Sequence, residues 1–230
     1  MSEIDSKVVP HFQDELEKLK ARLLVMAGEA EEQLRLAVSS LVDRDHDLVE
    51  RVLQSDDVIN SLHLEIDGRC FKLLALHQPM AVDLRVIVSA LKINSDLERV
   101  GDFAVNIAEA AREYLEHPAV KPLIDIPRMG AMAQGMLRDS LNAYIEHDSI
   151  LAQQVLDRDD ELDALKDQVF RELLSFMLKD QSTTEPSLDL ILISRHLERI
   201  GDHATNIAEE VIFIVSGLDV RHHSQEGENV

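Results

Sequence analysis

The sequence has few glycine, proline and aromatic residues and no long apolar run. Of its 230 residues, 8 are glycine, 6 are proline and 3% are aromatic, whereas 45% are hydrophobic. This composition favours helices, because strands are enriched in aromatic residues and tight turns need glycine and proline. The apolar stretch at 211–218 is far shorter than the roughly 20 residues that span a bilayer. We therefore predict an all-α protein that does not insert directly into the membrane.

The chain also lacks a second cysteine and the pattern of a secretory signal. Cys70 cannot form an internal disulfide, and the first residues, MSEIDSKVV, do not place a basic segment before an apolar one. We therefore expect a cytoplasmic protein.

The 44 acidic and 23 basic residues give a formal net charge of −21. This charge repels nucleic acid and anionic lipid, so we expect no nucleic-acid partner and predict cations or basic surfaces as ligands.

One polar block occurs twice, one hundred residues apart. Residues 97–109 read LERVGDFAVNIAE and residues 197–209 read LERIGDHATNIAE, with ten of thirteen positions identical. Upstream, residues 30–57 align with 133–160 without a gap at an offset of 103. The change of offset from 103 to 100 predicts loops of different length between the two segments. The chain is therefore a tandem duplication, and the shared polar residues indicate a site rather than a core.

Apolar residues at three- and four-residue spacing predict six helices, at 12–42, 48–77, 81–114, 128–145, 149–178 and 188–216. Pro118, Pro122 and Pro127 separate the third helix from the fourth. We therefore predict two tandem, pseudo-symmetric three-helix bundles. The first repeat with an N-terminal extension covers 1–117, a linker covers 118–127, the second repeat covers 128–217, and a disordered polar tail covers 218–230.

The duplicated acidic residues share one face of a helix. At about 100° per residue, Glu98, Asp102 and Asn106 lie within roughly 80° of arc, opposite an apolar stripe. Their counterparts in the second repeat are Glu198, Asp202 and Asn206. Like charges one turn apart destabilise a helix by roughly a few tenths of a kcal/mol per pair. We therefore expect this repulsion to be compensated by some other group.

The second helix of each repeat carries a further pair of oxygen-bearing side chains. Asp159 and Asp163 lie one turn apart, as do Asp56 and Asn60. If the second and third helices of a repeat pack antiparallel, the two ladders converge on a set of oxygens suited to a divalent or trivalent metal ion. A zinc site of the cysteine type is not expected, because the chain has one cysteine.

Five residues beside the stripes have simpler predicted roles. Arg99 and Arg199 are expected to pair with neighbouring carboxylates. Gly101 and Gly201 lie inside helices, where glycine costs about 1 kcal/mol against alanine, so they predict the close approach of another backbone or a ligand. His203 replaces Phe103 of the first copy and is a candidate additional ligand in the second repeat alone.

Two other interpretations remain open from the residues. A metal-free acidic scaffold that binds a basic partner would show the same amphipathic pattern. A carboxylate-bridged di-metal enzyme also places acids in a helical bundle, but such sites use Glu-x-x-His on two helices. None of the ten histidines follows a glutamate by three residues. The chain also lacks a Walker-type phosphate loop, a dinucleotide-binding glycine fingerprint and a nucleophile elbow, so no enzyme is predicted.

The segments LEIDGRCFKLLALHQPMAVDLR, LKINSDLERVGDFAVNIAE and ISRHLERIGDHATNIAEEVIF resemble those of the PhoU family of bacterial phosphate-uptake regulators. The resemblance extends from about residue 15 to residue 217. It implies two three-helix bundles with multinuclear metal clusters held by paired E(D)xxxD motifs. These motifs are Glu98 with Asp102, Glu198 with Asp202, and Asp159 with Asp163. The fourth pair, Asp56 with Asn60, departs from the motif at its second position.

The same resemblance implies a regulatory, non-catalytic function. PhoU-like proteins connect the ATPase and membrane subunits of the phosphate ABC transporter with a phosphate sensor histidine kinase, and keep the phosphate-starvation response off when phosphate is plentiful. It further implies a homodimer, a location at the inner membrane through these partners, and metal ions such as iron, zinc, manganese or magnesium.

Overall fold

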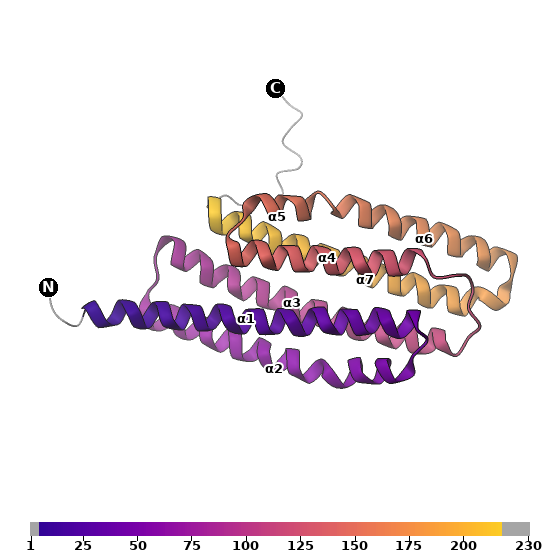
Figure 1. Ribbon diagram of the computed structural model, residues 1–230, viewed down its shortest axis with the longest axis horizontal. Coiled ribbons are helices and arrows are strands. Elements are labelled where there is room, and N and C mark those ends of the chain that lie inside the picture. Colours follow the sequence, from indigo (N-terminus) through magenta and orange to yellow (C-terminus); the bar gives the residue numbers. More distant parts are fainter. Residues whose placement is uncertain (1–4, 218–230) are drawn as a thin grey trace, which may run out of the picture.

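The computed structural model describes residues 5–217 and confirms the all-α fold. Within this range the elements are α1 (Asp5–Val42), α2 (His46–His77), α3 (Ala81–Leu115), α4 (Asp125–Glu146), α5 (Ser149–Leu156), α6 (Asp159–Lys179), the 3-10 turn η1 (Gln181–Thr183) and α7 (Thr184–Ser216), without a strand. The long helices run side by side along the molecule (Figure 1). No helix among these residues combines the length and apolarity needed to cross a membrane. The predicted disordered tail at 218–230 lies outside the described residues.

Equivalent aspartates begin the second helix of each repeat. The side chain of Asp45 accepts hydrogen bonds from the backbone N–H groups of Asp47 and Leu48 at the start of α2. Asp148 caps α5 in the same way, accepting from Ile150 and Leu151. These residues are paired at the offset of 103. Part of the duplicated polar sequence is therefore explained by helix capping.

The predicted fifth helix, 149–178, is interrupted at Asp157 and Arg158 and continues as α6. The Arg158 guanidinium donates to the carbonyl of Gln154 at 3.1 Å and to Asp139 on α4 at 2.6 Å. Three acidic residues occupy the first turn of α6, where the helix dipole favours negative charge. A new helix start is therefore stabilised at this position. Apolar periodicity did not indicate it, because Val155 and Leu162 keep helical spacing across the break.

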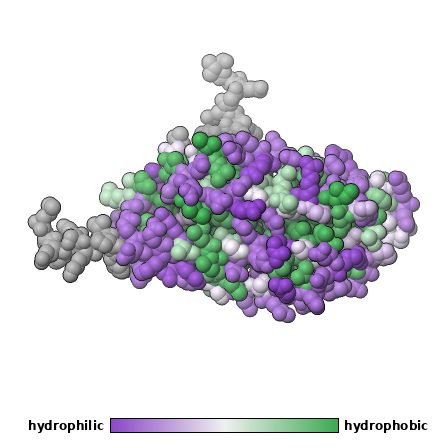
Figure 2. All heavy atoms as spheres, in the orientation of Figure 1, coloured by the Kyte–Doolittle hydropathy of each residue, from purple (hydrophilic) through white to green (hydrophobic). Residues whose placement is uncertain are grey.

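The third helices of the two repeats, α3 and α7, pack against each other and form the centre of the molecule. The residues on their inner faces, such as Leu97, Ile107, Leu197 and Ile207, are fully buried. They belong to one continuous core that includes both repeats. Hydrophilic side chains cover most of the visible outer face, with hydrophobic residues gathered between them (Figure 2). The duplicated polar blocks therefore project from a shared central helix pair.

Gly101 and Gly201 mark the closest approach of the second helix to the third in each repeat. A Cβ atom at Gly101 would lie 2.8 Å from Cδ1 of Ile59 on α2, and one at Gly201 would overlap Cδ2 of Leu162 on α6. Ile59 and Leu162 are equivalent at the offset of 103. The predicted close approach is present, but the approaching group is a side chain rather than a backbone or a ligand.

Candidate functional site

In the second repeat, the structure brings the two predicted ladders together between α6 and α7. Lys166 Nζ lies 3.2 Å from Asp163 Oδ1 on its own helix and 3.2 Å from Glu198 Oε1 on α7. Asp159 Oδ1 lies 3.7 Å from the Cβ position of Gly201, one residue before Asp202. Asp159, Asp163, Glu198 and Asp202 therefore form one cluster, which we call the α6–α7 acidic cluster.

The α6–α7 acidic cluster holds more negative charge than the protein compensates. Burial, followed by repulsion from Asp202, Asp163, Asp160 and Glu198, raises the pKa of Asp159 to about 6. The Oε2 atom of Glu198 is buried and accepts no hydrogen bond within the described structure. Crowded carboxylates disfavour their own ionised forms unless a cation is added. The cluster thus has both oxygen donors and unmet charge.

Basic side chains provide part of the expected compensation. Arg199 Nη1 donates to Asp202 Oδ2 at 2.9 Å, and Arg99 Nη1 donates to Asp102 Oδ2 at the same distance. Both predicted arginine pairs are therefore confirmed. Lys166, which the sequence analysis missed, bridges the two helices. It lies three residues after Asp163, and this spacing on a helix is the signal that could have found it.

The corresponding residues of the first repeat are joined less closely. Asn60 Nδ2 donates to Asp56 Oδ2 at 2.9 Å within α2. Among the described residues, no hydrogen bond or ion pair connects this pair to Glu98 or Asp102 on α3. Asn60 also replaces the negative charge that Asp163 supplies in the second repeat. The first repeat therefore has fewer charged donors and no bridging lysine.

The two predicted asparagines lie at the edge of the stripes. Asn206 Nδ2 donates to Asp96 Oδ1 on α3 at 3.2 Å, and His203 Nδ1 lies 2.7 Å from the same oxygen. Both side chains of the second repeat thus contact the first repeat. Asn106 is half-buried on α3. In this structure Asn206 and His203 join the repeats to each other instead of contacting the carboxylates of Glu198 and Asp202.

The donor set of the α6–α7 acidic cluster fits a hard or borderline metal ion. All four side chains offer carboxylate oxygens, which are the ligands that such ions prefer. Across residues 12–217, whose side chains are described, no three His, Cys, Asp or Glu side chains form a preformed metal cage. Lys166 and Arg199 pair with three of the four carboxylates here. A metal ion would therefore compete with these two side chains for the same oxygens.

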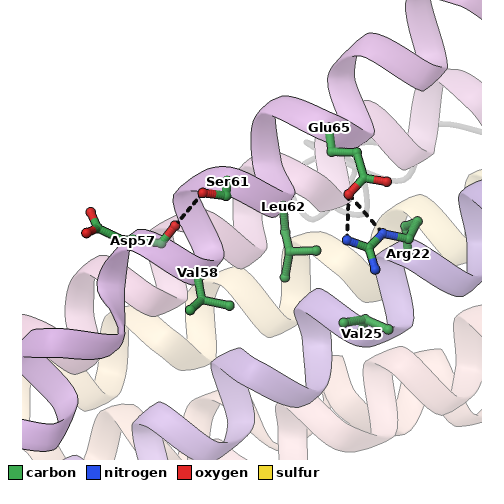
Figure 3. A pocket seen from close by; sticks show the side chains of 7 residues that line it. All are labelled: Arg22, Val25, Asp57, Val58, Ser61, Leu62 and Glu65. Atoms are coloured by element: carbon green, nitrogen blue, oxygen red, sulfur yellow. Dashed lines mark hydrogen bonds and ion pairs between the residues drawn. The ribbon is translucent and has the colours of Figure 1, made fainter.

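A groove in the first repeat differs from the acidic surfaces. It lies between α1 and α2, has a volume of about 450 Å³, and is lined by Val25, Val58 and Leu62. Figure 3 shows Val58 and Leu62 of α2 facing Val25 of α1, while Arg22 and Glu65 close one end. Arg22 Nε donates to Glu65 Oε2 at 3.0 Å. The groove thus has apolar walls and a polar end.

The second repeat carries an ion pair at the equivalent surface. At the offset of 103, Arg128 and Glu161 correspond to Val25 and Val58. Arg128 Nη2 donates to Glu161 Oε1 at 2.7 Å. The duplicated halves therefore retain the same helix packing but present different chemistry at this surface.

The sequence and the structure of this chain match proteins of the same family. The family model described as the PhoU domain matches residues 23–111 and again residues 126–211. A protein of Caulobacter vibrioides, named phosphate-specific transport system accessory protein PhoU homolog, is 42% identical over 213 residues, covering 92% of this chain and 93% of its own. The homologue of that name from Pseudomonas aeruginosa is 40% identical, covering 92% and 88%.

Solved structures match over nearly the whole chain. The crystal structure of PhoU from Pseudomonas aeruginosa has a TM-score of 0.88 and 38% sequence identity, covering 90% of this chain and 100% of the other. The regulatory protein PhoU of the phosphate transport system of Streptococcus pneumoniae has a TM-score of 0.83 and 29% identity, covering 91% and 99%. Both the sequence and the helix arrangement are thus shared over the two repeats.

Proposed function

The chain belongs to the PhoU family, and from this premise we propose that it is an accessory regulator of phosphate uptake. Two copies of the family domain account for most of the described chain, and the relatives are named as accessory proteins of the phosphate-specific transport system. In this proposal the protein restrains the phosphate-starvation response by linking the phosphate ABC transporter to its sensor histidine kinase on the cytoplasmic side of the membrane. It acts as a homodimer and catalyses no reaction.

The α6–α7 acidic cluster is the proposed metal centre of this regulator. Asp159, Asp163, Glu198 and Asp202 would hold a divalent or trivalent cation, such as iron, zinc, manganese or magnesium. The observation that carries this proposal is the crowding of four carboxylates, which raises the pKa of Asp159 and includes a buried oxygen of Glu198 that accepts no hydrogen bond. A bound cation supplies the positive charge that this cluster lacks.

The first repeat would hold a second, weaker centre. Its ligands are Glu98, Asp102, Asp56 and Asn60, with Asn106 at its edge. Because Asn60 is neutral and already donates to Asp56, this centre offers less negative charge to a cation. Asn206 is the corresponding edge residue of the second repeat.

A metal-free acidic scaffold is the competing function, and one observation favours it. Lys166 and Arg199 already pair with three carboxylates of the α6–α7 acidic cluster. In that alternative the remaining acidic surface would bind a basic partner directly. Metal analysis separates the two proposals, because only the first requires a bound cation.

The decisive experiment measures metal content and membrane recruitment on the same protein. The protein is purified without an affinity tag, analysed by elemental mass spectrometry, and sedimented with membranes. We expect bound metal and binding to membranes that contain the phosphate transporter or the sensor kinase, but not to protein-free anionic liposomes, which the net charge of −21 repels. Combined Glu198→Ala and Asp202→Ala substitutions should weaken both. Recruitment indifferent to metal removal and to these substitutions would refute a role for the cluster.

A further inference from the structure

A pocket opens beside the α6–α7 acidic cluster, on the outer side of the same two helices. It has a volume of about 400 Å³, and its charged lining residues are Lys166, Asp167, Arg195, Glu198 and Arg199. Phe170 and Ile191 form the apolar part of its wall. Pockets that hold small molecules start at roughly 300 Å³ and combine apolar walls with a few polar groups. The pocket is therefore large enough for a small ligand.

At the equivalent position of the first repeat, polar side chains link the two helices. Asn94, Asp67 and His63 correspond there to Ser194, Phe170 and Lys166. Asn94 Nδ2 donates to Asp67 Oδ1 at 2.9 Å and to the His63 carbonyl at 3.0 Å, which ties α2 to α3. The shorter Ser194 donates instead to the Ile191 carbonyl of its own helix at 2.8 Å. The second repeat therefore lacks the side-chain link between these helices that Asn94 makes in the first repeat.

Three basic side chains line the pocket, and they differ in their partners. Arg195 is exposed and makes no ion pair with any residue of the described range. Lys166 pairs with Asp163 and Glu198 at 3.2 Å and with Asp167 at 3.7 Å, and Arg199 pairs with Asp202 at 2.9 Å and with Glu198 at 3.7 Å. As the cluster stands, these carboxylates neutralise two of the three positive charges. An anion in the pocket would then meet a single uncompensated guanidinium.

We propose that this pocket binds hydrogen phosphate when a cation occupies the α6–α7 acidic cluster. The inference rests on the proposed metal centre and adds a ligand and a form of regulation to it. A cation that takes the oxygens of Asp163, Glu198 and Asp202 leaves Arg199 without its acidic partners and leaves Lys166 with only the more distant Asp167, 3.7 Å away. Together with Arg195, these groups supply several charge-assisted donors to one oxyanion. Metal and phosphate would therefore each strengthen the binding of the other, by the same factor.

Asp167 gives the pocket a means to select free phosphate. Its side chain lines the same space, and a carboxylate can only accept a hydrogen bond. Hydrogen phosphate keeps one proton at neutral pH and can donate it to this oxygen. Sulfate has no proton, and a phosphate monoester loses its second proton with a pKa of about 6. The ligand that suits both the basic residues and Asp167 is thus free orthophosphate.

The test is equilibrium dialysis of labelled orthophosphate against the full chain, with and without saturating Mg²⁺, and with metal content measured on the same samples. We expect phosphate binding only with the metal. Arg195→Ala should weaken it about 10- to 100-fold, as removal of a charged hydrogen-bond donor does. The matched control is Arg99→Ala, which removes the same charge from the first repeat and should leave the affinity unchanged. Asp167→Asn should reduce the preference for phosphate over sulfate.

The outcomes separate this inference from the proposed function. Metal-loaded protein that binds no phosphate, or binds it equally well after Arg195→Ala, would overturn the inference and leave the metal centre intact. Phosphate binding that is independent of metal would overturn the coupling. Tighter binding of phenyl phosphate than of orthophosphate would show that the pocket takes monoesters and would refute the assignment to free phosphate. Protein that takes up no metal would refute the metal centre and the inference together.

Discussion

His203 of the second repeat meets Asp96 of the first, with Nδ1 2.7 Å from Oδ1. At the offset of 100, the related pair is Phe103 and His196, whose ring centroids lie 5.6 Å apart. Phe103 also lies 5.6 Å from the ring of His203, so the contact between α3 and α7 combines the polar His203–Asp96 pair with the packing of three rings. The replacement of phenylalanine by histidine at position 203 therefore adds a polar contact between the two repeats.

Replacing His203 by phenylalanine, the residue of the first repeat, should destabilise the protein. The substitution removes the hydrogen bond to the half-buried Asp96, so we expect the free energy of unfolding to fall by about 1–2 kcal/mol. Urea denaturation followed by circular dichroism measures this change. Thr205→Val, which also restores a residue of the first repeat, is the control and should change the stability by less than about 0.5 kcal/mol. If the two substitutions lowered the stability equally, the His203–Asp96 contact would not contribute specifically to the packing of the two repeats.

Alanine should be destabilising at Gly101 and Gly201 and stabilising at Gly68. A Cβ atom would press on Ile59 or Leu162, which are buried and cannot swing into solvent, so we expect a loss of about 1–2 kcal/mol. Nothing lies within 4 Å of a Cβ at Gly68, and alanine there should gain about 0.5–1 kcal/mol from helix propensity. Thermal and urea unfolding of the three variants decide this. A higher stability of the Gly201→Ala variant would show that α6 and α7 can move apart without loss of packing energy.

Asp159→Asn should stabilise the metal-free protein at pH 7. The folded-state pKa of Asp159 is about 6, above its ordinary value near 3.8, so the folded protein binds more protons than the unfolded chain between these values. Stability is consequently lost as pH rises through this window, and asparagine avoids the loss. The difference from the native protein should vanish below about pH 4. Asp57→Asn, at an exposed position of the first repeat, is the control for a general charge effect.

The two proposed metal centres should be independent. Combined Glu98→Ala and Asp102→Ala substitutions should remove metal from the first repeat and leave the second loaded. Folding should survive, because the change relieves repulsion between like charges and alanine favours helix. Elemental analysis of the purified variant measures the remaining metal. Complete loss, or an unchanged ratio of metal to protein, would argue against two separate centres.

The duplication made much of this structure accessible from sequence. A residue that is present in both copies is expected to make the same contact in each, and both arginine pairs were predicted correctly on this basis. Contacts between the copies were not accessible in this way. Buried Glu210 accepts from Ser89 at 2.8 Å and from Lys92 at 2.7 Å across the two repeats, but Ala110 occupies its equivalent position. No internal repetition could therefore indicate that this acid is buried.

The sequence predicted which residues form the candidate site, but it predicted only part of the contacts that they make. Helical spacing placed Glu198 and Asp202 on one face, and the packing of α6 on α7 brought Asp159 beside them. Asn206 shares the acidic stripe in the sequence but donates a hydrogen bond to Asp96 on α3. This contact was not predictable, because helical periodicity does not show that α3 packs beside this face of α7. The spacing of Lys166 from Asp163 indicates a pair within α6, but the second contact of Lys166, with Glu198 on α7, was not predictable because helical spacing does not show which helix packs beside it.

The groove between Val25 and Val58, and the Arg128–Glu161 ion pair at its counterpart, show what fusion of two copies permits. In a dimer of identical single repeats, one gene encodes both surfaces, so symmetry forces every mutation to appear on each side. Joining the copies in one chain releases them from that constraint. Each half can then change on its own, while the covalent connection keeps the two surfaces in a ratio of one to one.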